Sequence, residues 1–259
     1  MKIIQLSDLH LTEGGQPLFG SVPEQRLAAA LDTIVREHAD AEFCLLTGDL
    51  AENGSEAVYR RLASMLAALP MPSHVLPGNH DHRPAMARVF PVHGEAFHQQ
   101  AVPSSLGVFL LLDTVCDGQP WGAFDALRGA WLTARLAETA PAPVWLVMHH
   151  PPFAVGIPSM DQYALRDPQW FLAAVMPERE RIRHLLFGHL HRAIGGSWRG
   201  IPFSCTRSPN HQVALDLVRH TPEVPGGHEA PAFAVILADE EKVVVHQQDF
   251  LATGPEFWL

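Results

Sequence analysis

Residues 75–81 set the interpretation of the whole sequence, and they run Val75-Leu76-Pro77-Gly78-Asn79-His80-Asp81. A short apolar segment stops at a proline and a glycine, which is the pattern of a buried strand that ends in a tight turn. The turn then carries an amide, an imidazole and a carboxylate, which are all side chains that bind metals. Taken alone, this segment is equally well explained as an ordinary turn, because Asn and Gly favour turn geometry.

Four other apolar segments end in the same way, and each is followed at once by side chains of metal-ligand type. They are Leu6-Ser7-Asp8-Leu9-His10, Leu45-Leu46-Thr47-Gly48-Asp49, Leu146-Val147-Met148-His149-His150 and Leu185-Leu186-Phe187-Gly188-His189-Leu190-His191. Ligands of open α/β sheets bind at the carboxyl ends of the strands, so a parallel sheet would bring these segments together. Each segment alone could be a turn or a helix cap, but the ordered set of five predicts one shared metal site.

Amphipathic segments alternate with these apolar strands over the first two thirds of the chain. The predicted helices are Pro23–Arg36, with Ser21 as N-cap, and Ser55–Leu69, Asp125–Glu138 and Asp167–Val175. The last third instead contains short strands, at 197–202, Gln212–Leu217, Phe233–Leu237 and Val243–Gln248. This order predicts an α/β (α+β) fold of two mixed sheets packed together and flanked by helices. We expect a single domain over residues 1–259, with the strands of about 195–250 completing the second sheet.

The composition restricts the partners of this chain. Its formal net charge is −10 over 259 residues, and a field of that sign repels polyanions, so no nucleic-acid partner is expected. Cys44, Cys116 and Cys205 are odd in number and widely spaced, which argues against a disulfide framework. No apolar run approaches the roughly 20 residues of a membrane span, and the N-terminal segment already resembles a strand. We therefore expect a cytoplasmic protein with no membrane partner.

The residue types at the five strand ends favour particular metals. Carboxylate, imidazole and amide groups without a thiolate suit Mn, Fe, Zn or Co better than Ca or Mg, which prefer shells made only of oxygen. Gly48, Gly78 and Gly188 stand beside the candidate ligands, where the absence of a Cβ allows a sharp turn and a close approach.

In this order, the motifs from Asp8 to His191 resemble the signature of calcineurin-like metallophosphoesterases. The resemblance implies a four-layer α/β/β/α sandwich and two divalent metal ions. It implies that Asp49 bridges the two metals, that one metal is held by Asp8, His10, Asp49 and His191, and that the other is held by Asp49, Asn79, His149 and His189. It further implies that a metal-bridging hydroxide attacks phosphorus, and that His80 faces the substrate without binding a metal.

Flanking residues narrow the resemblance. Glu52 stands where purple acid phosphatases have a tyrosine ligand, and Asp81 stands where protein serine/threonine phosphatases have a glutamate. The chain has no room for the coiled-coil arm of the related DNA-repair nucleases. It is most similar to class III cyclic nucleotide phosphodiesterases and bacterial glycerophosphodiesterases, on the segments 148–152, 182–189, 198–203 and 210–213. The expected enzyme is a phosphodiester hydrolase acting on a small substrate; the alternatives are a Mn-dependent nuclease, a phosphomonoesterase and a non-enzymatic scaffold.

Several roles stay open at this point. His150 supports the ligands or is structural, and Asp81 either orients His80 or only stabilises its turn. Asn79 and His80 are expected to bind substrate, and His211 either reaches the substrate as well or has a structural role. Specificity is expected in the loops 117–124 and 156–166, where Trp121, Met160 and Tyr163 either line the pocket or pack locally. A homo-oligomer is possible, but nothing in the sequence requires one.

Overall fold

The protein is described by a computed structural model that covers residues 1–92, 97–251, 254 and 257–258. Its first sheet has five strands, in the order β15-β14-β1-β2-β3. They are β1 (Lys2–Leu6), β2 (Phe43–Thr47), β3 (Ser73–Leu76), β14 (Ala232–Ala238) and β15 (Val243–Asp249). The strands β1, β2 and β3 are parallel to one another, and β14 and β15 add antiparallel to them.

The second sheet has six strands, in the order β10-β11-β9-β7-β5-β4. They are β4 (Gln100–Ser104), β5 (Gly107–Leu112), β7 (Val144–Met148), β9 (Ile182–Phe187), β10 (Ile194–Trp198) and β11 (Ile201–Cys205). The central strands β5, β7, β9 and β11 are parallel. Two short pairs lie outside these sheets, β6 (Gly122–Ala123) with β8 (Leu165–Arg166) and β12 (Gln212–Val213) with β13 (Gly226–Gly227).

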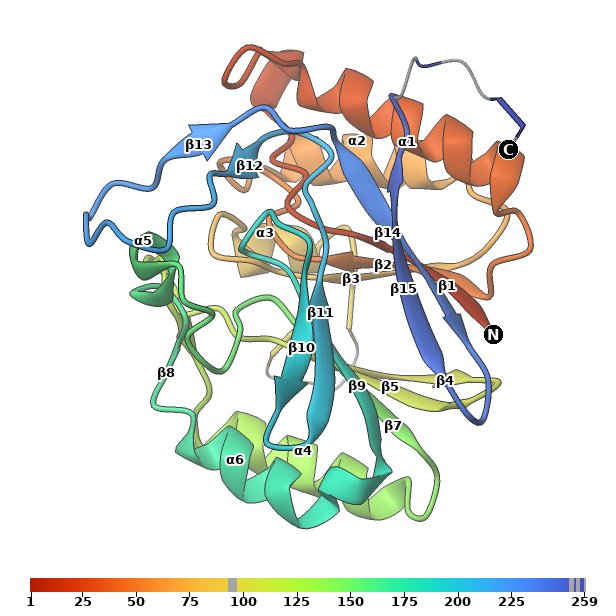
Figure 1. The fold of residues 1–259 in the computed structure, drawn as a ribbon, viewed down its shortest axis with the longest axis vertical. Helices are drawn as coiled ribbons and strands as arrows, with labels where there is room; N and C mark the ends of the chain where they lie inside the picture. The colour runs from red at the N-terminus through yellow and green to blue at the C-terminus, as the bar shows by residue number, and fades with distance from the viewer. Residues whose placement is uncertain (93–96, 252–253, 255–256, 259) are drawn as a thin grey trace.

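Helices cover the outer face of each sheet, and Figure 1 shows α1 and α2 on one side of the molecule with α4 and α6 on the other. The helices are α1 (Pro23–Glu37), α2 (Glu56–Leu66), α3 (Arg83–Ala87), α4 (Ala126–Glu138), α5 (Pro158–Asp161) and α6 (Gln169–Val175), with 3-10 turns η1 (Glu13–Gly15) and η2 (Met176–Arg181). In the described part of the chain, no helix combines the length and apolarity needed to cross a membrane.

Three apolar clusters fill the spaces between these layers. One joins the first sheet to its helices, through residues such as Leu46, Leu27 and Leu62, and another does the same for the second sheet and α4 and α6. The third lies between the sheets, where the rings of Phe109 and Trp145 stack with centroids 4.9 Å apart. The predicted four-layer α/β/β/α sandwich is therefore confirmed.

The strands of the last third differ from the prediction that they would complete the second sheet. Strands β10 and β11 do so, but β14 and β15 extend the first sheet instead. Strand β14 pairs antiparallel with β1, with Ile3 opposite Ile236, and this pairing covers the otherwise open edge of β1. It also buries Phe233 against the helices and Ile236 between the sheets, so both faces of β14 are used.

The predicted N-cap of the first helix is wrong. Val22 occupies the cap position of α1 without a side-chain hydrogen bond, and Pro23 stands at the start of the helix, where no amide hydrogen needs a partner. The hydroxyl of Ser21 instead donates a hydrogen bond to the side-chain oxygen of Asn210. Ser21 thus connects the segment before α1 to a segment about 190 residues further along the chain.

Candidate metal centre and adjoining cavity

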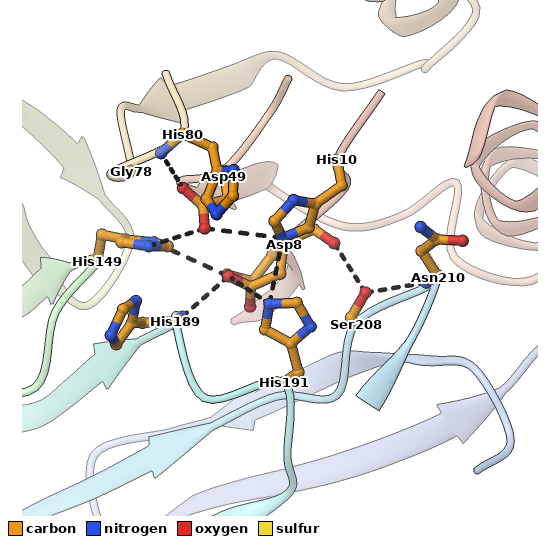
Figure 2. Close-up of polar contacts among 12 residues, drawn as sticks. Asp8, His10, Asp49, Gly78, His80, His149, His189, His191, Ser208 and Asn210 are labelled. Atoms are coloured by element: carbon orange, nitrogen blue, oxygen red, sulfur yellow. Dashed lines mark hydrogen bonds and ion pairs between the residues drawn. The ribbon is translucent and has the colours of Figure 1, made fainter. Parts of the chain in front are cut away.

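The five predicted strand ends meet at one end of the molecule. Strands β1, β2 and β3 come from the first sheet and β7 and β9 from the second, and the loops that follow them converge (Figure 2). The side chains brought together are those of Asp8, His10, Asp49, Asn79, His149, His189 and His191. Except for Asn79, which is half-buried, all of them are buried.

The backbone at these ligand positions is unusual. Left-handed φ values, between 47° and 68°, occur at Asp8, His10, Asp49, His189 and His191. Residues with a Cβ are uncommon in this region, and such strain gathers at functional sites where the surroundings enforce it. The enforcing contacts here are backbone hydrogen bonds, from the amide of Asp8 to the carbonyl of Gly48 at 3.0 Å and from that of His10 to Asp49 at 2.9 Å.

Two glycines make room for the ligands. A Cβ on Gly78 would lie 2.2 Å from Oδ1 of Asp49, and a Cβ on Gly48 would lie 2.3 Å from Nδ1 of His149. Both distances are far below any real contact, so only glycine fits at either position. Gly48 also has a φ of +99°, which residues with a side chain rarely adopt.

The first donor group consists of Asp8, His10, Asp49 and His191, whose donor atoms all lie within 4.8 Å of one another. Nε2 of His191 is 3.7 Å from Oδ1 of Asp8, and Nε2 of His10 is 3.7 Å from Oδ2 of Asp49. These four residues are the set that the family resemblance implies for one metal.

The residues that the resemblance implies for a second metal are Asp49, Asn79, His149 and His189. Nε2 of His149 is 3.4 Å from Oδ2 of Asp49 and 3.2 Å from Oδ1 of Asn79. The ring of His189 lies 5.1 Å from that of His149. The carboxylate of Asp49 therefore stands between the two groups, as expected for a shared ligand.

Three of the candidate ligand imidazoles are held through Nδ1, an orientation that suits metal binding through Nε2. Nδ1 of His149 donates to the carbonyl of Thr47 at 2.8 Å, and Nδ1 of His191 donates to the carbonyl of His211 at 2.9 Å. Nδ1 of His10 lies 2.7 Å from Oε2 of Glu52. Outer partners of this kind fix the tautomer of a ligand histidine and leave Nε2 for the metal.

Unpartnered polar atoms at the centre also fit metal ions. Oδ2 of Asp8 and Nε2 of His189 are buried without a hydrogen-bond partner among the described residues. Buried polar atoms are nearly always paired, so these atoms are explained if a cation completes their coordination. Since the donors are carboxylate, imidazole and amide groups, the residues present fit divalent metals such as Mn, Fe, Zn or Co.

Burial prepares two of the four candidate ligand imidazoles, those of His189 and His191, to act as neutral ligands. It lowers the pKa of His191 to about 3 and lowers that of His189, so both are neutral near pH 7. Burial also raises the pKa of Asp8 to about 6. Burial alone would lower the pKa of His149, but Asp49 and Asp8 raise it to about 9. A metal bound to His149 must therefore displace a proton.

His80 lies at the edge of this centre and is its most exposed imidazole. Its backbone amide donates to Oδ1 of Asp49 at 2.9 Å, and its Nδ1 lies 3.1 Å from the carbonyl oxygen of Glu52. Its ring is 4.7 Å from that of His10, and its side chain is 38% exposed. Together with His10 and Glu52 it forms a further cluster of donor atoms.

Glu52 is a site residue that the sequence did not single out. Its carboxylate is 2.7 Å from Nδ1 of His10 and 3.6 Å from Nδ1 of His80, so it contacts both an expected ligand and the expected substrate-facing residue. In the sequence it was noted only as the place where a tyrosine ligand is missing. Its position three residues after Asp49, in the same turn, was the available signal.

The open question about Asp81 is answered by its contacts. Its carboxylate accepts hydrogen bonds from the backbone amides of Leu50, Ala51 and Gly78 at 2.9–3.0 Å and from the hydroxyl of Tyr59 at 2.9 Å. It therefore joins the turn after β2 to the turn after β3. No hydrogen bond from Asp81 to the imidazole of His80 is formed among the described residues, so its role is to hold the turns.

His150 takes a supporting position. Its Nδ1 lies 2.8 Å from the hydroxyl of Thr114, and its ring centroid is 4.6 Å from that of His189. With His149 and His189 it forms a buried group of three imidazoles. Burial holds the pKa of His150 well below its ordinary value.

A cavity of about 560 Å³ opens beside the two donor groups. One side of it is formed by predicted ligands and His80. The other side comes from several segments that are distant in the sequence, and it includes Phe19, Met160, Tyr163, His211, Val213 and Val224. The ring of His211 lies 4.6 Å from that of His191, which places it within the site. Trp121 is not among the lining residues, and the guanidinium of Arg166 covers its ring at 3.3 Å.

Sequence comparisons agree with the resemblance. The family model for calcineurin-like phosphoesterases matches residues 1–193. A protein of Rhodopseudomonas palustris named as a probable cyclic nucleotide phosphodiesterase is 40% identical over 268 residues, which cover 100% of this chain and 96% of that protein. A probable glycerophosphodiester phosphodiesterase of Arcobacter nitrofigilis is 30% identical over 84% of this chain and 81% of its own length. The 3',5'-cyclic adenosine monophosphate phosphodiesterase of Escherichia coli is 29% identical over 82% of this chain and 78% of its own.

Solved structures share the fold at low sequence identity. A dimetal phosphatase from Danio rerio superposes with a TM-score of 0.69 at 14% identity, covering 96% of both chains. A purple acid phosphatase from yellow lupin gives the same TM-score at 12% identity, covering 96% of this chain and 51% of that one. These likenesses support the four-layer architecture alone.

Proposed function

This chain belongs to the calcineurin-like phosphoesterase family, and we propose that it is a two-metal phosphodiesterase that hydrolyses small phosphodiesters, cyclic nucleotides above all. The observation that carries the proposal is the position of Asp49, which belongs to the donor group of Asp8, His10 and His191, lies 3.4 Å from His149 and lines a cavity of about 560 Å³. The preference for cyclic nucleotides is supported by the name of the relative that is 40% identical over the whole chain.

The first metal would be held by Asp8, His10, Asp49 and His191, and the second by Asp49, Asn79, His149 and His189. Bound there, two divalent ions supply Lewis acidity and an activated water for attack on phosphorus. Only two of these ligands are carboxylates, so the loaded site is positive enough to attract a phosphodiester anion despite the net charge of −10.

The protein's own contribution is to place His80 against the substrate. Nδ1 of His80 is occupied by the carbonyl oxygen of Glu52 at 3.1 Å, which leaves Nε2 to bond an oxygen of the substrate. A donor at that place stabilises the charge that develops on the phosphoryl group or protonates the departing oxygen. The hydrogen bond from the amide of His80 to Asp49 keeps this imidazole at a fixed distance from the metal ligands.

A substrate panel tests the proposal. The protein is loaded separately with Mn, Fe, Zn and Co and assayed on cyclic AMP, glycerophosphoethanolamine and p-nitrophenyl phosphate. We expect the highest kcat/KM on a diester, with cyclic AMP first. Activity confined to the phosphomonoester, or to single-stranded DNA added as a fourth substrate, would contradict the proposed function.

A further inference from the structure

Phe19 occupies a turn that does not suit it. Leu18 and Ser21 pair as the ends of a two-residue hairpin turn, with backbone hydrogen bonds of 2.8 and 3.1 Å. The two central residues, Phe19 and Gly20, have φ values of 45° and 85°. Turns with positive φ at both central positions favour Asn, Asp or Gly, and a bulky residue there is strained. The turn geometry therefore gives no reason for an aromatic side chain.

A second turn in the same molecule supports this point. Arg199 and Gly200 connect β10 to β11 with φ values of 52° and 88°, which nearly reproduce the backbone of Phe19 and Gly20. Arg199 does not line the cavity, whereas Phe19 does. Two turns with similar φ values thus carry different side chains, a charged one away from the cavity and an aromatic one beside it.

The ring of Phe19 is exposed yet directed to the active centre. It remains 63% exposed, and its centroid lies 4.8 Å from that of His211. The ring of His211 in turn lies 5.0 Å from that of His10. A series of rings thus runs from the first donor group to the mouth of the cavity. The hydrogen bond from Ser21 to Asn210 fixes the turn to the segment that carries His211.

We infer that Phe19 is the stacking surface for a planar ring on the substrate, so that the site favours diesters carrying a nucleobase over diesters of glycerol. The inference rests on the proposed function and adds the residue that selects among small diesters. A base stacked on an aromatic side chain gains roughly tenfold or more in affinity, and glycerol has no flat face to stack. Met160 and Val224, which also line the cavity, add apolar surface for such a ring.

Binding measurements on variants of the two turns test this inference. Calorimetry on the Mn-loaded protein gives the Kd of 5'-AMP and of glycerol 3-phosphate, the products of the two diester classes. Phe19→Asn should weaken AMP about tenfold and glycerol 3-phosphate less than twofold, since Asn tolerates the turn but cannot stack in the same way. The matched control Arg199→Asn should change neither Kd, and Phe19→Tyr should keep AMP within about threefold of the native value.

The Tm of Phe19→Asn distinguishes a stacking role from a packing role, because loss of a packing contact would lower it. Because the ring is exposed and the backbone strained, Phe19→Asn should leave Tm unchanged or raise it. Failure of AMP to bind, unchanged AMP binding in Phe19→Asn, or equal weakening of both products would overturn the inference. If the native protein binds AMP through Phe19 but hydrolyses no diester, the proposed function is refuted while the stacking role stands.

Discussion

The two sides of the cavity are built on different principles. Five of the seven predicted ligands, His10, Asp49, Asn79, His189 and His191, line one side of the cavity, and the seven ligands together are here called the floor. The floor stands on the ends of five strands from two sheets. The other side, here called the wall, consists of Phe19, Met160, Tyr163, His211, Val213 and Val224 and comes from several segments that are distant in the sequence. Asp8 and His149 on the floor are fully buried, whereas Phe19 on the wall is 63% exposed. The floor is suited to fixed metal chemistry, and the wall can vary with the substrate without disturbing it.

Removing the shared ligand should have the largest effect. Asp49→Ala deletes the carboxylate that stands between both donor groups, so both metals should be lost and hydrolysis of bis(p-nitrophenyl) phosphate should fall to background. Elemental analysis and a diesterase assay measure this. The control Asp32→Ala, on the exposed side of α1, should behave as the native protein. Retention of full activity in Asp49→Ala would show that hydrolysis does not depend on metals held by Asp49.

The variant His80→Ala tests whether His80, at the edge of the floor, acts in the reaction without binding a metal. We expect kcat to fall by roughly 10²-fold or more, which is typical for loss of a proton donor at the reacting group, while the metal content stays that of the native protein. Steady-state kinetics together with elemental analysis decide the matter. A loss of metal in this variant would show that His80 is a ligand and that the assigned donor groups are incomplete.

Variants of Glu52 test whether the hydrogen bond to Nδ1 of His10 is needed for metal binding by the floor. Glu52→Ala removes the carboxylate that bonds Nδ1 of His10 and lies 3.6 Å from Nδ1 of His80, and activity or metal affinity should fall by about 10- to 100-fold. Glu52→Gln retains an oxygen that accepts from Nδ1 of His10, so it should recover most of the metal affinity. Metal titrations and kcat measurements compare the two, with Glu56→Ala on α2 as control. Equal losses in the Ala and Gln variants would argue against orientation through hydrogen bonding.

The smallest effect is expected on the wall. The hydroxyl of Tyr163 donates to the carbonyl of Pro222 at 3.3 Å, and Figure 1 shows that α5 and the connection between β12 and β13 run side by side. Tyr163→Phe removes this tie, so KM should rise about threefold, as for one partly exposed hydrogen bond, with kcat and metal content unchanged. A fall in metal content would show that changes in the wall affect metal binding by the floor.

The floor could be predicted from sequence because parallel strands impose their geometry on whatever follows them. Once Asp8, Asp49 and His189 are assigned to strand ends, the sheets leave little freedom in where their side chains meet. One donor group, Asp8, His10, Asp49 and His191, is the set expected for the first metal, whereas the group around His149 and His189 also contains His150. The sequence did not reveal the long-range contacts that hold the turns in place, such as the hydrogen bond from Tyr59 to Asp81.

The wall could be predicted only in part, because its segments are distant in the sequence. The sequence offered Met160, Tyr163 and His211 as candidates to line the pocket or reach the substrate, but not Phe19, Val213 or Val224. Phe19, Tyr163 and Val224 come together only through tertiary packing, and no periodicity marks them. Phe19 carried a local signal in the dipeptide Phe19-Gly20, but a turn alone does not reveal what it borders. The antiparallel pairing of β14 with β1 was missed for a similar reason, since its partners lie more than 200 residues apart.

Anomalous X-ray scattering from crystals of the Mn-loaded protein, collected at the Mn absorption edge, tests the central claim most directly. Two peaks about 3.5–4 Å apart are expected. Both should contact Asp49, one of them among Asp8, His10 and His191 and the other among Asn79, His149 and His189. A single peak, or two peaks that do not share Asp49, would contradict the two-metal centre.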